Sequence, residues 1–247
     1  MPSLLSVTGL VKRFGELLVT DHFNLELPLG ELHALIGPNG AGKTTLMGQL
    51  TGELNPSGGD IRLDGQSILG WRPPRRALAG MARSYQITQL LKGFSVLENV
   101  QMMVQAKHGH SFHFWAPAQR DASLIRPAMA ALEGVGLAHR ARDDVMSLAH
   151  GEHRQLELAM ALAMEPRLLL LDEPLAGMSQ AESVVMVDLL KRLKGQYTIL
   201  LVEHDMQAVF SLADRLSVLV YGRAIACGTP SQIQSNEGVR RAYLGDE

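Results

Sequence analysis

The alternation of apolar and polar residues divides the chain into segments of different character. From residue 4 to residue 36, alternating positions are interrupted by turn-forming residues, which predicts short strands joined by tight turns. From residue 87 to residue 146, apolar residues recur at helical spacing, most clearly in 96–104 and 124–137. The middle of the chain is therefore predicted to be a helical insert between segments rich in strands.

Continuous apolar runs occupy 32–36, 168–171 and 197–202. Such runs are typical of parallel strands that helices cover on both faces. Each run ends at glycine or charged residues, and the carboxyl ends of parallel strands meet at the edge where open sheets bind their ligands. Residues 216–228 read as a hairpin. The sequence predicts an α/β protein with its site at that edge.

Two segments are predicted to be solvated connections. Trp71–Arg76 contains arginines broken by two prolines. His108–Trp115 contains His108, His110 and His113 among aromatic residues, but its spacing matches no standard metal site. We expect a loop there and no metal centre.

Composition narrows the possible functions. The chain has 247 residues, of which 46% are apolar and 19% are charged. This length is enough for one large α/β domain or two small ones. The formal net charge of −2 gives no electrostatic case for nucleic-acid binding. The single cysteine, Cys227, forms no intramolecular disulfide and fits a reducing compartment. No signal peptide or membrane-spanning run is visible, so we expect a soluble, cytosolic protein whose membrane contact another subunit supplies.

The most informative motif runs from residue 37 to residue 45 and fits the pattern G-x-x-x-x-G-K-[ST] between a predicted strand and a predicted helix. Its residues are Gly37, Pro38, Asn39, Gly40, Ala41, Gly42, Lys43, Thr44 and Thr45. Glycines allow successive backbone N–H groups to surround a phosphate, and the helix directs its positive end to the same place. Lys43 is expected to reach the β- and γ-phosphates of a bound nucleotide, and the Thr44 hydroxyl to bind Mg²⁺.

Polar residues at three other predicted strand ends complete a candidate site. Asp172 is expected to bind Mg²⁺, directly or through water, and Glu173 to accept a proton from the attacking water. His204 follows the next strand and could contact the γ-phosphate or orient that water. Gln86 could sense the phosphate and the metal. Phe14 is either a core aromatic or a surface on which adenine stacks.

Together these motifs resemble the ATP-binding subunits of ABC transporters over essentially the whole chain. The family signature is expected shortly before Asp172, where the chain has Leu148, Ala149, His150, Gly151 and Glu152. The resemblance implies a P-loop NTPase (RecA-like) parallel-sheet core, an N-terminal antiparallel β subdomain and an α-helical insert. It divides a single domain, 1–247, into a core of 1–86 and 147–247 and a helical subdomain of 87–146. It also implies that Gln86 is the Q-loop residue and a metal contact, that His204 is the switch histidine, and that Phe14 stacks on adenine.

A narrower resemblance is to the ATPases of branched-chain amino acid importers. It rests on 82–86, on the His150-Gly151-Glu152 form of the signature, on 171–178 and on the terminal 241–245. It implies a second ATPase subunit (a paralogue or another copy), transmembrane permease subunits, a periplasmic solute-binding protein, and a place at the cytoplasmic face of the bacterial inner membrane. ATPases for urea, amide or aromatic-acid uptake share the pattern, and lipopolysaccharide-export ATPases share part of it.

Three residues, at two places in the chain, depart from the family pattern. Ala149 and His150 replace the usual serine and first glycine of the signature, which removes a hydroxyl donor and a conformationally free position. Ser179 stands where many relatives have an aspartate. Both variants occur among the amino-acid importers, so we still expect an active ATPase.

Rival functions fit less well. A non-transport ABC ATPase would carry two cassettes or a long inserted coiled coil, and this chain has neither. A small GTPase would need an Asn-Lys-x-Asp segment to read guanine, and the sequence contains none. A kinase that uses the same phosphate loop is the remaining alternative.

Overall fold

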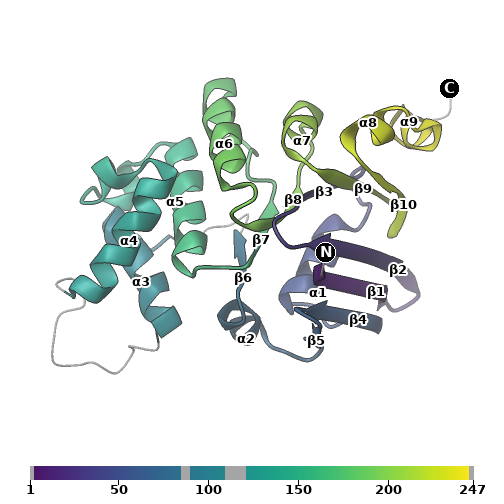
Figure 1. Ribbon diagram of the computed structural model, residues 1–247, viewed down its shortest axis with the longest axis horizontal. Helices are drawn as coiled ribbons and strands as arrows, with labels where there is room; N and C mark the ends of the chain where they lie inside the picture. The colour runs from purple at the N-terminus through teal and green to yellow at the C-terminus, as the bar shows by residue number, and fades with distance from the viewer. Residues whose placement is uncertain (1–2, 85–89, 109–120, 245–247) are drawn as a thin grey trace.

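A six-stranded sheet lies at the centre of the computed structural model, which describes residues 3–84, 90–108 and 121–244 (Figure 1). Its strand order is β10-β9-β3-β8-β7-β6, and every neighbouring pair is parallel except β9 and β10. The strands are β3 (Leu32–Ile36), β6 (Met81–Ser84), β7 (Leu168–Asp172), β8 (Thr198–Val202), β9 (Arg215–Val220) and β10 (Arg223–Gly228). The predicted buried strands and the C-terminal hairpin are confirmed.

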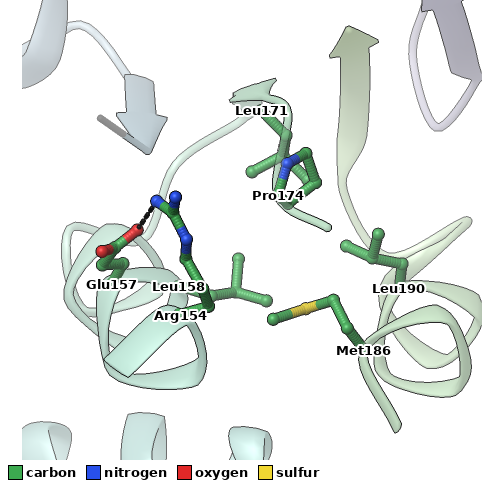
Figure 2. A pocket seen from close by; sticks show the side chains of 7 residues that line it. All are labelled: Arg154, Glu157, Leu158, Leu171, Pro174, Met186 and Leu190. Atoms are coloured by element: carbon green, nitrogen blue, oxygen red, sulfur yellow. Dashed lines mark hydrogen bonds and ion pairs between the residues drawn. The ribbon is translucent and has the colours of Figure 1, made fainter. Parts of the chain in front are cut away.

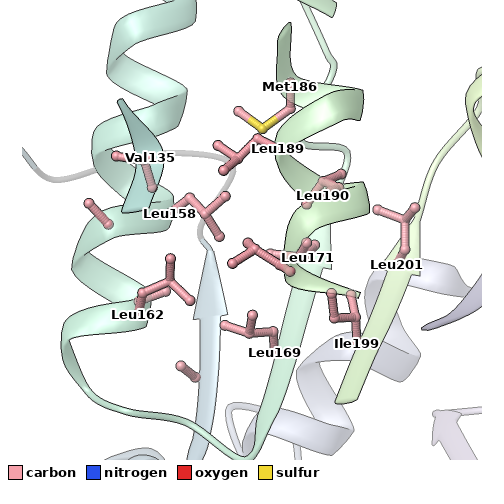
Figure 3. Packing of buried hydrophobic residues seen from close by; sticks show 14 of the residues in the cluster. Val135, Leu158, Leu162, Leu169, Leu171, Met186, Leu189, Leu190, Ile199 and Leu201 are labelled. Atoms are coloured by element: carbon pink, nitrogen blue, oxygen red, sulfur yellow. The ribbon is translucent and has the colours of Figure 1, made fainter. Parts of the chain in front are cut away.

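Successive residues of the central strands pack alternately into two hydrophobic cores, one on each face of the sheet. Leu169 and Leu171 face a core shared with the helical side of the molecule, where α5 (His150–Ala163) and α6 (Gln180–Leu193) lie against them (Figure 3). Leu168 and Leu170 face the other core, which contains the helix after the phosphate loop and the second sheet. Because both faces of the sheet are covered, β3, β7 and β8 are each buried over all five of their residues.

The second sheet has four strands in the order β2-β1-β4-β5. Its strands are β1 (Ser3–Phe14), β2 (Leu17–Pro28), β4 (Gly58–Leu63) and β5 (Gln66–Ser67). All its pairings are antiparallel. The prediction of short strands over 4–36 was wrong, since β1 and β2 have 12 residues each. Register shifts between Ser3 and Arg13 interrupt the ladder, and such bulges break the alternation without ending the strand.

Helices flank the central sheet on one side (Figure 1). They are α3 (Val96–His108), α4 (Ala122–Val135), α5 (His150–Ala163), α6 (Gln180–Leu193) and α7 (Met206–Leu212), with short 3-10 turns at Ala138–Arg140 and Val145–Ser147. The chain continues after β10 as α8 (Pro230–Gln234) and α9 (Glu237–Leu244). None of the helices in the described ranges is long and apolar enough to cross a lipid bilayer.

The helices α3, α4 and α5 pack against one another, and α5 also contacts β6. The helical segment predicted for 87–146 thus joins the sheet through α5. The division into core and helical subdomain stays a proposal. Within the predicted loop His108–Trp115, His108 is the last residue of α3, and residues 109–115 lie outside the described residues.

The prediction that Trp71–Arg76 is a solvated connection was wrong. The segment leads into α2 (Pro73–Leu78), and Arg76 is 1% exposed. Its guanidinium donates to Gln49 O (2.8 Å) and Leu50 O (2.5 Å) at the end of α1 (Lys43–Thr51) and also to Trp71 O and Ile68 O. Helix carbonyls at a C-terminus lack partners within the helix and carry partial negative charge, so they accept a buried cation. Burial lowers the pKa of Arg76.

We expect Arg76→Met to lower the free energy of unfolding by about 3 kcal/mol, because it leaves buried carbonyl groups without donors. Denaturant titration measures the change. The matched control is Arg75→Met, since Arg75 is exposed and lies 3.9 Å over the Trp71 ring. The control should change stability by under about 1 kcal/mol. Equal effects of the two changes would contradict this role of Arg76.

Candidate functional site

The segment 37–45 forms a tight loop between β3 and α1. A Cβ on Gly37 would lie 2.1 Å from Leu219 O, so only glycine fits beside β9. Gly42 has φ +101°, and a Cβ there would lie 2.7 Å from Val19 O. The Gly222 amide donates to Ala41 O (2.9 Å), which ties the loop to the β9–β10 hairpin. The loop is therefore constrained both by the close approach of Leu219 and Val19 and by the hydrogen bond from Gly222.

Lys43 is folded back over this loop. Its Nζ donates to Gly37 O (2.7 Å) and Pro38 O (3.1 Å). Burial lowers the pKa of Lys43, while the charges of Glu173 and Asp172 oppose that shift. The Lys43 ammonium group thus interacts electrostatically with the carboxylates of Glu173 and Asp172. The Thr44 side chain, by contrast, is exposed to solvent.

The ends of β7 and β8 bring Glu173 and His204 together. The strands are parallel with Asp172 opposite Val202, and the Glu173 amide donates to Val202 O (2.8 Å). The His204 Nε2 lies 2.7 Å from Glu173 Oε1. Glu173 has φ +51°, a conformation that costs a non-glycine residue about 1–3 kcal/mol and is found at functional sites. The predicted pair of base and switch histidine is therefore in direct contact.

Two residues without a predicted role, Arg83 and Glu203, also have contacts at this edge of the sheet. Arg83, on β6, donates from one guanidinium nitrogen to Asp172 Oδ2 (2.9 Å) and from another to Glu53 Oε2 (2.7 Å). Glu203 is 4% exposed and accepts from the Leu175 amide (2.7 Å) and the His204 amide (3.0 Å). Burial raises the pKa of the Glu203 carboxyl, and the backbone N–H groups oppose that shift. The only sequence signal was a charged residue at or beside a strand end.

Oxygen ligands suited to Mg²⁺ are present at this edge. Thr44 offers a hydroxyl and Asp172 a carboxylate that is oriented by Arg83. The described residues contain no cluster of three or more His, Cys, Asp or Glu side chains placed to hold a metal ion. Mg²⁺ in phosphate-binding sites uses one or two protein oxygens and completes its shell with phosphate and water. The residues therefore fit Mg²⁺ that arrives with a nucleotide.

The segment 148–152 forms the N-terminus of α5. Leu148 is buried, and the amide of Ala149 donates to Glu152 Oε2 (2.8 Å). The Gly151 amide donates to Glu182 Oε1 (2.9 Å) on α6, and His150 Nε2 lies 3.3 Å from Ala176 O. No hydrogen bond or ion pair between described residues joins this segment to the loop 37–45.

Phe14 and Gln86 are the remaining predicted site residues. Phe14 ends β1 with 48% of its surface exposed, and Lys12 Nζ lies 5.0 Å from its ring centroid. An exposed ring is available for stacking, which fits the second of its two interpretations. Gln86 lies outside the described residues.

Comparisons with known proteins agree with this geometry. Residues 20–176 match the ABC transporter family, and residues 225–247 match the family described as branched-chain amino acid ATP-binding cassette transporter. The chain is 41% identical to the high-affinity branched-chain amino acid transport ATP-binding protein LivG of Escherichia coli (strain K12), over 98% of each chain. It is 39% identical to BraF of Pseudomonas aeruginosa, which has the same description, again over 98% of each. The solved structure of the ADP conformation of MJ1267, an ATP-binding cassette of an ABC transporter, superposes with a TM-score of 0.87 and 26% identity, covering 100% of both chains.

We expect Gly42→Ala to lower the free energy of unfolding by about 3 kcal/mol, because it adds both a left-handed alanine and a clash with Val19 O. Gly40→Ala is the matched control, since Gly40 has φ +79° but nothing within 4 Å of an added Cβ. The control should cost about 1 kcal/mol. Both are measured by denaturant titration without nucleotide. A Gly42 variant no less stable than the Gly40 variant would show that the Val19 contact does not constrain the loop.

Proposed function

We propose a function from one premise: this chain belongs to the ABC transporter family, and it is an ATPase of that family. Within the family we propose that it is the ATP-binding subunit of a branched-chain amino acid importer. The identity to LivG and BraF over nearly the whole chain supports that substrate class, as does the match of 225–247. The observation that carries the ATPase mechanism is the contact of His204 with Glu173 beside Lys43 and Asp172.

Binding of ATP is proposed to begin at the loop 37–45. Lys43 would exchange its two carbonyl acceptors for β- and γ-phosphate oxygens, while the amides of the loop and of α1 surround the phosphates. Phe14 would stack on the adenine. Thr44, Asp172 and Gln86 would hold Mg²⁺, which supplies neutralising charge on the phosphates.

Hydrolysis is proposed to use Glu173 and His204. A water molecule attacks the γ-phosphorus, Glu173 accepts a proton from that water, and the bond to ADP breaks to release phosphate. The His204 imidazole, 2.7 Å from Glu173 Oε1, fixes the carboxylate and can contact the γ-phosphate from the next strand. The left-handed backbone at Glu173 directs its side chain to this edge of the sheet.

The site in one chain is proposed to be half of a composite site. The described structure leaves the loop 37–45 without a partner surface from 148–152, so the γ-phosphate would face solvent in a single chain. A second ATPase subunit, a paralogue or another copy, would add the N-terminus of its signature helix and exclude water. ATP would then favour the closed dimer, and hydrolysis would open it. Permease subunits would receive the motion at the cytoplasmic face of the inner membrane, and a periplasmic solute-binding protein would deliver the substrate.

We expect Glu173→Gln to reduce ATP turnover at least about a hundredfold while the Kd for ATP stays within about twofold, because the amide cannot accept the proton. Turnover is measured by phosphate release and binding by calorimetry. ATP should also trap the variant as a dimer in size-exclusion chromatography. The control is Glu133→Gln, an exposed carboxylate on α4, which should behave as the unchanged chain. Full turnover in Glu173→Gln would refute the proposed mechanism.

We expect cells that lack this chain to lose high-affinity uptake of radiolabelled leucine, and the Glu133→Gln copy, but not the Glu173→Gln copy, to restore it. Urea and benzoate uptake in the same cells serve as comparisons. Unchanged leucine uptake together with lost urea or benzoate uptake would assign the importer to another substrate class.

A further inference from the structure

Glu203 is a buried acid that joins the two strand ends bearing Glu173 and His204. It follows β8 directly and is 4% exposed. One carboxylate oxygen accepts from the Leu175 amide (2.7 Å), two residues after Glu173, and the other accepts from the His204 amide (3.0 Å). A single side chain therefore fixes the backbone beside both members of the pair.

The contact with the Leu175 amide lies two residues after Glu173, whose backbone is in the strained left-handed conformation. The Glu173 amide is held by Val202 O, and Pro174 has no N–H to donate. The Leu175 amide is consequently the first backbone donor after Glu173, and it is buried with Glu203 as its acceptor. Because a left-handed non-glycine residue persists only where its surroundings fix it, this contact holds Glu173 at φ +51°.

The second contact restricts His204. On its other side, Asp205 caps α7 by accepting from the Gln207 (2.9 Å) and Ala208 (3.1 Å) amides. The His204 backbone thus lies between a helix cap and the Glu203 carboxylate. The His204 imidazole therefore contacts Glu173 from a backbone position that is restrained on both sides.

A comparison with another buried acid shows what is unusual about Glu203. Glu157, on α5, is also buried, but it pairs with the cation Arg154 (2.9 Å) at the edge of a small pocket between α5 and α6 (Figure 2). Glu203 has no ion-pair partner within the described ranges. A buried carboxylate costs several kcal/mol unless it is satisfied. At Glu203 the groups that satisfy it are backbone amides of the two segments carrying the pair.

We propose that Glu203 is a positioning residue for ATP hydrolysis, whose carboxylate sets the distance between Glu173 and His204 by holding the Leu175 and His204 amides together. This inference rests on the roles proposed above for Glu173 and His204. Glu203 touches neither ATP nor water in this role and acts only through that pair.

The test is Glu203→Gln, which has the same shape but presents an NH₂ group to one of the two amides. We expect kcat to fall about tenfold while the KM and Kd for ATP stay within about twofold, because the loop 37–45 binds ATP independently. Glu157→Gln is the matched control. It should lower the unfolding midpoint and leave kcat unchanged, as expected of a buried acid with a structural role alone.

A double-mutant cycle separates positioning from general loss of structure. In a His204→Ala background, Glu203→Gln should lower kcat by clearly less than about tenfold, because only its hold on the Leu175 amide beside Glu173 is still there to be lost. A full tenfold loss in that background, or parallel changes in kcat and KM, would overturn the inference. If Glu203→Gln does not fold, Glu203→Asp decides: it keeps the charge but is too short to reach both amides, and the same loss of kcat is expected. Unchanged kcat in Glu203→Asp would overturn the inference.

The same set of variants distinguishes the two levels of proposal. If Glu173→Gln and His204→Ala lower turnover and the Glu203 variants do not, the positioning role is wrong and the proposed function stands. If Glu173→Gln retains turnover, the proposed function itself is wrong.

Discussion

Parallel pairing of β7 with β8 is the constraint on which the site depends. With Asp172 opposite Val202, the residues that follow each strand emerge side by side at one edge of the sheet. Glu173 and His204 are 31 residues apart in the chain, yet their side chains meet at 2.7 Å. β3 lies on the other side of β8 and delivers the loop 37–45 to the same edge. A shift of one residue in either pairing would turn the side chains to the opposite face and separate these groups.

Backbone groups satisfy three of the charged side chains that the fold buries. Arg76 donates to carbonyls at the end of α1, Lys43 to carbonyls of its own loop, and Glu203 accepts from two amides. These backbone partners have different roles at Arg76 and at Lys43. At Arg76 they are carbonyl groups at the C-terminal end of α1, where no further helical turn supplies donors. At Lys43 they are neutral carbonyl acceptors, and an ammonium ion bonds more strongly to an anionic oxygen than to a neutral carbonyl.

The N-terminus of α5 shows how the missing signature residues are compensated. Ala149 has no oxygen to cap the helix, and the Gly151 amide finds its acceptor in Glu182 of α6 instead. Hydrogen bonds from the Ser179 side chain, and from the Ser179 and Gly151 amides, lower the pKa of Glu182. The helix therefore begins in a stable form without the usual serine. Through Ser179, the same carboxylate links the N-terminus of α5 to the segment that follows Glu173.

The sequence by itself determined the loop 37–45, the buried strands and the acids at the end of β7, because these depend on local residue order: glycines where the backbone must turn, apolar runs where both faces are covered, and charge where a strand meets solvent. Only the tertiary structure decided what holds those groups. Arg76 was predicted to be solvated, Glu203 and Arg83 were visible only as charged residues at or beside a strand end, and bulges made β1 and β2 resemble shorter strands. Each of these depends on which distant segment lies opposite, and that is fixed by strand order and helix packing, which local residue patterns do not encode.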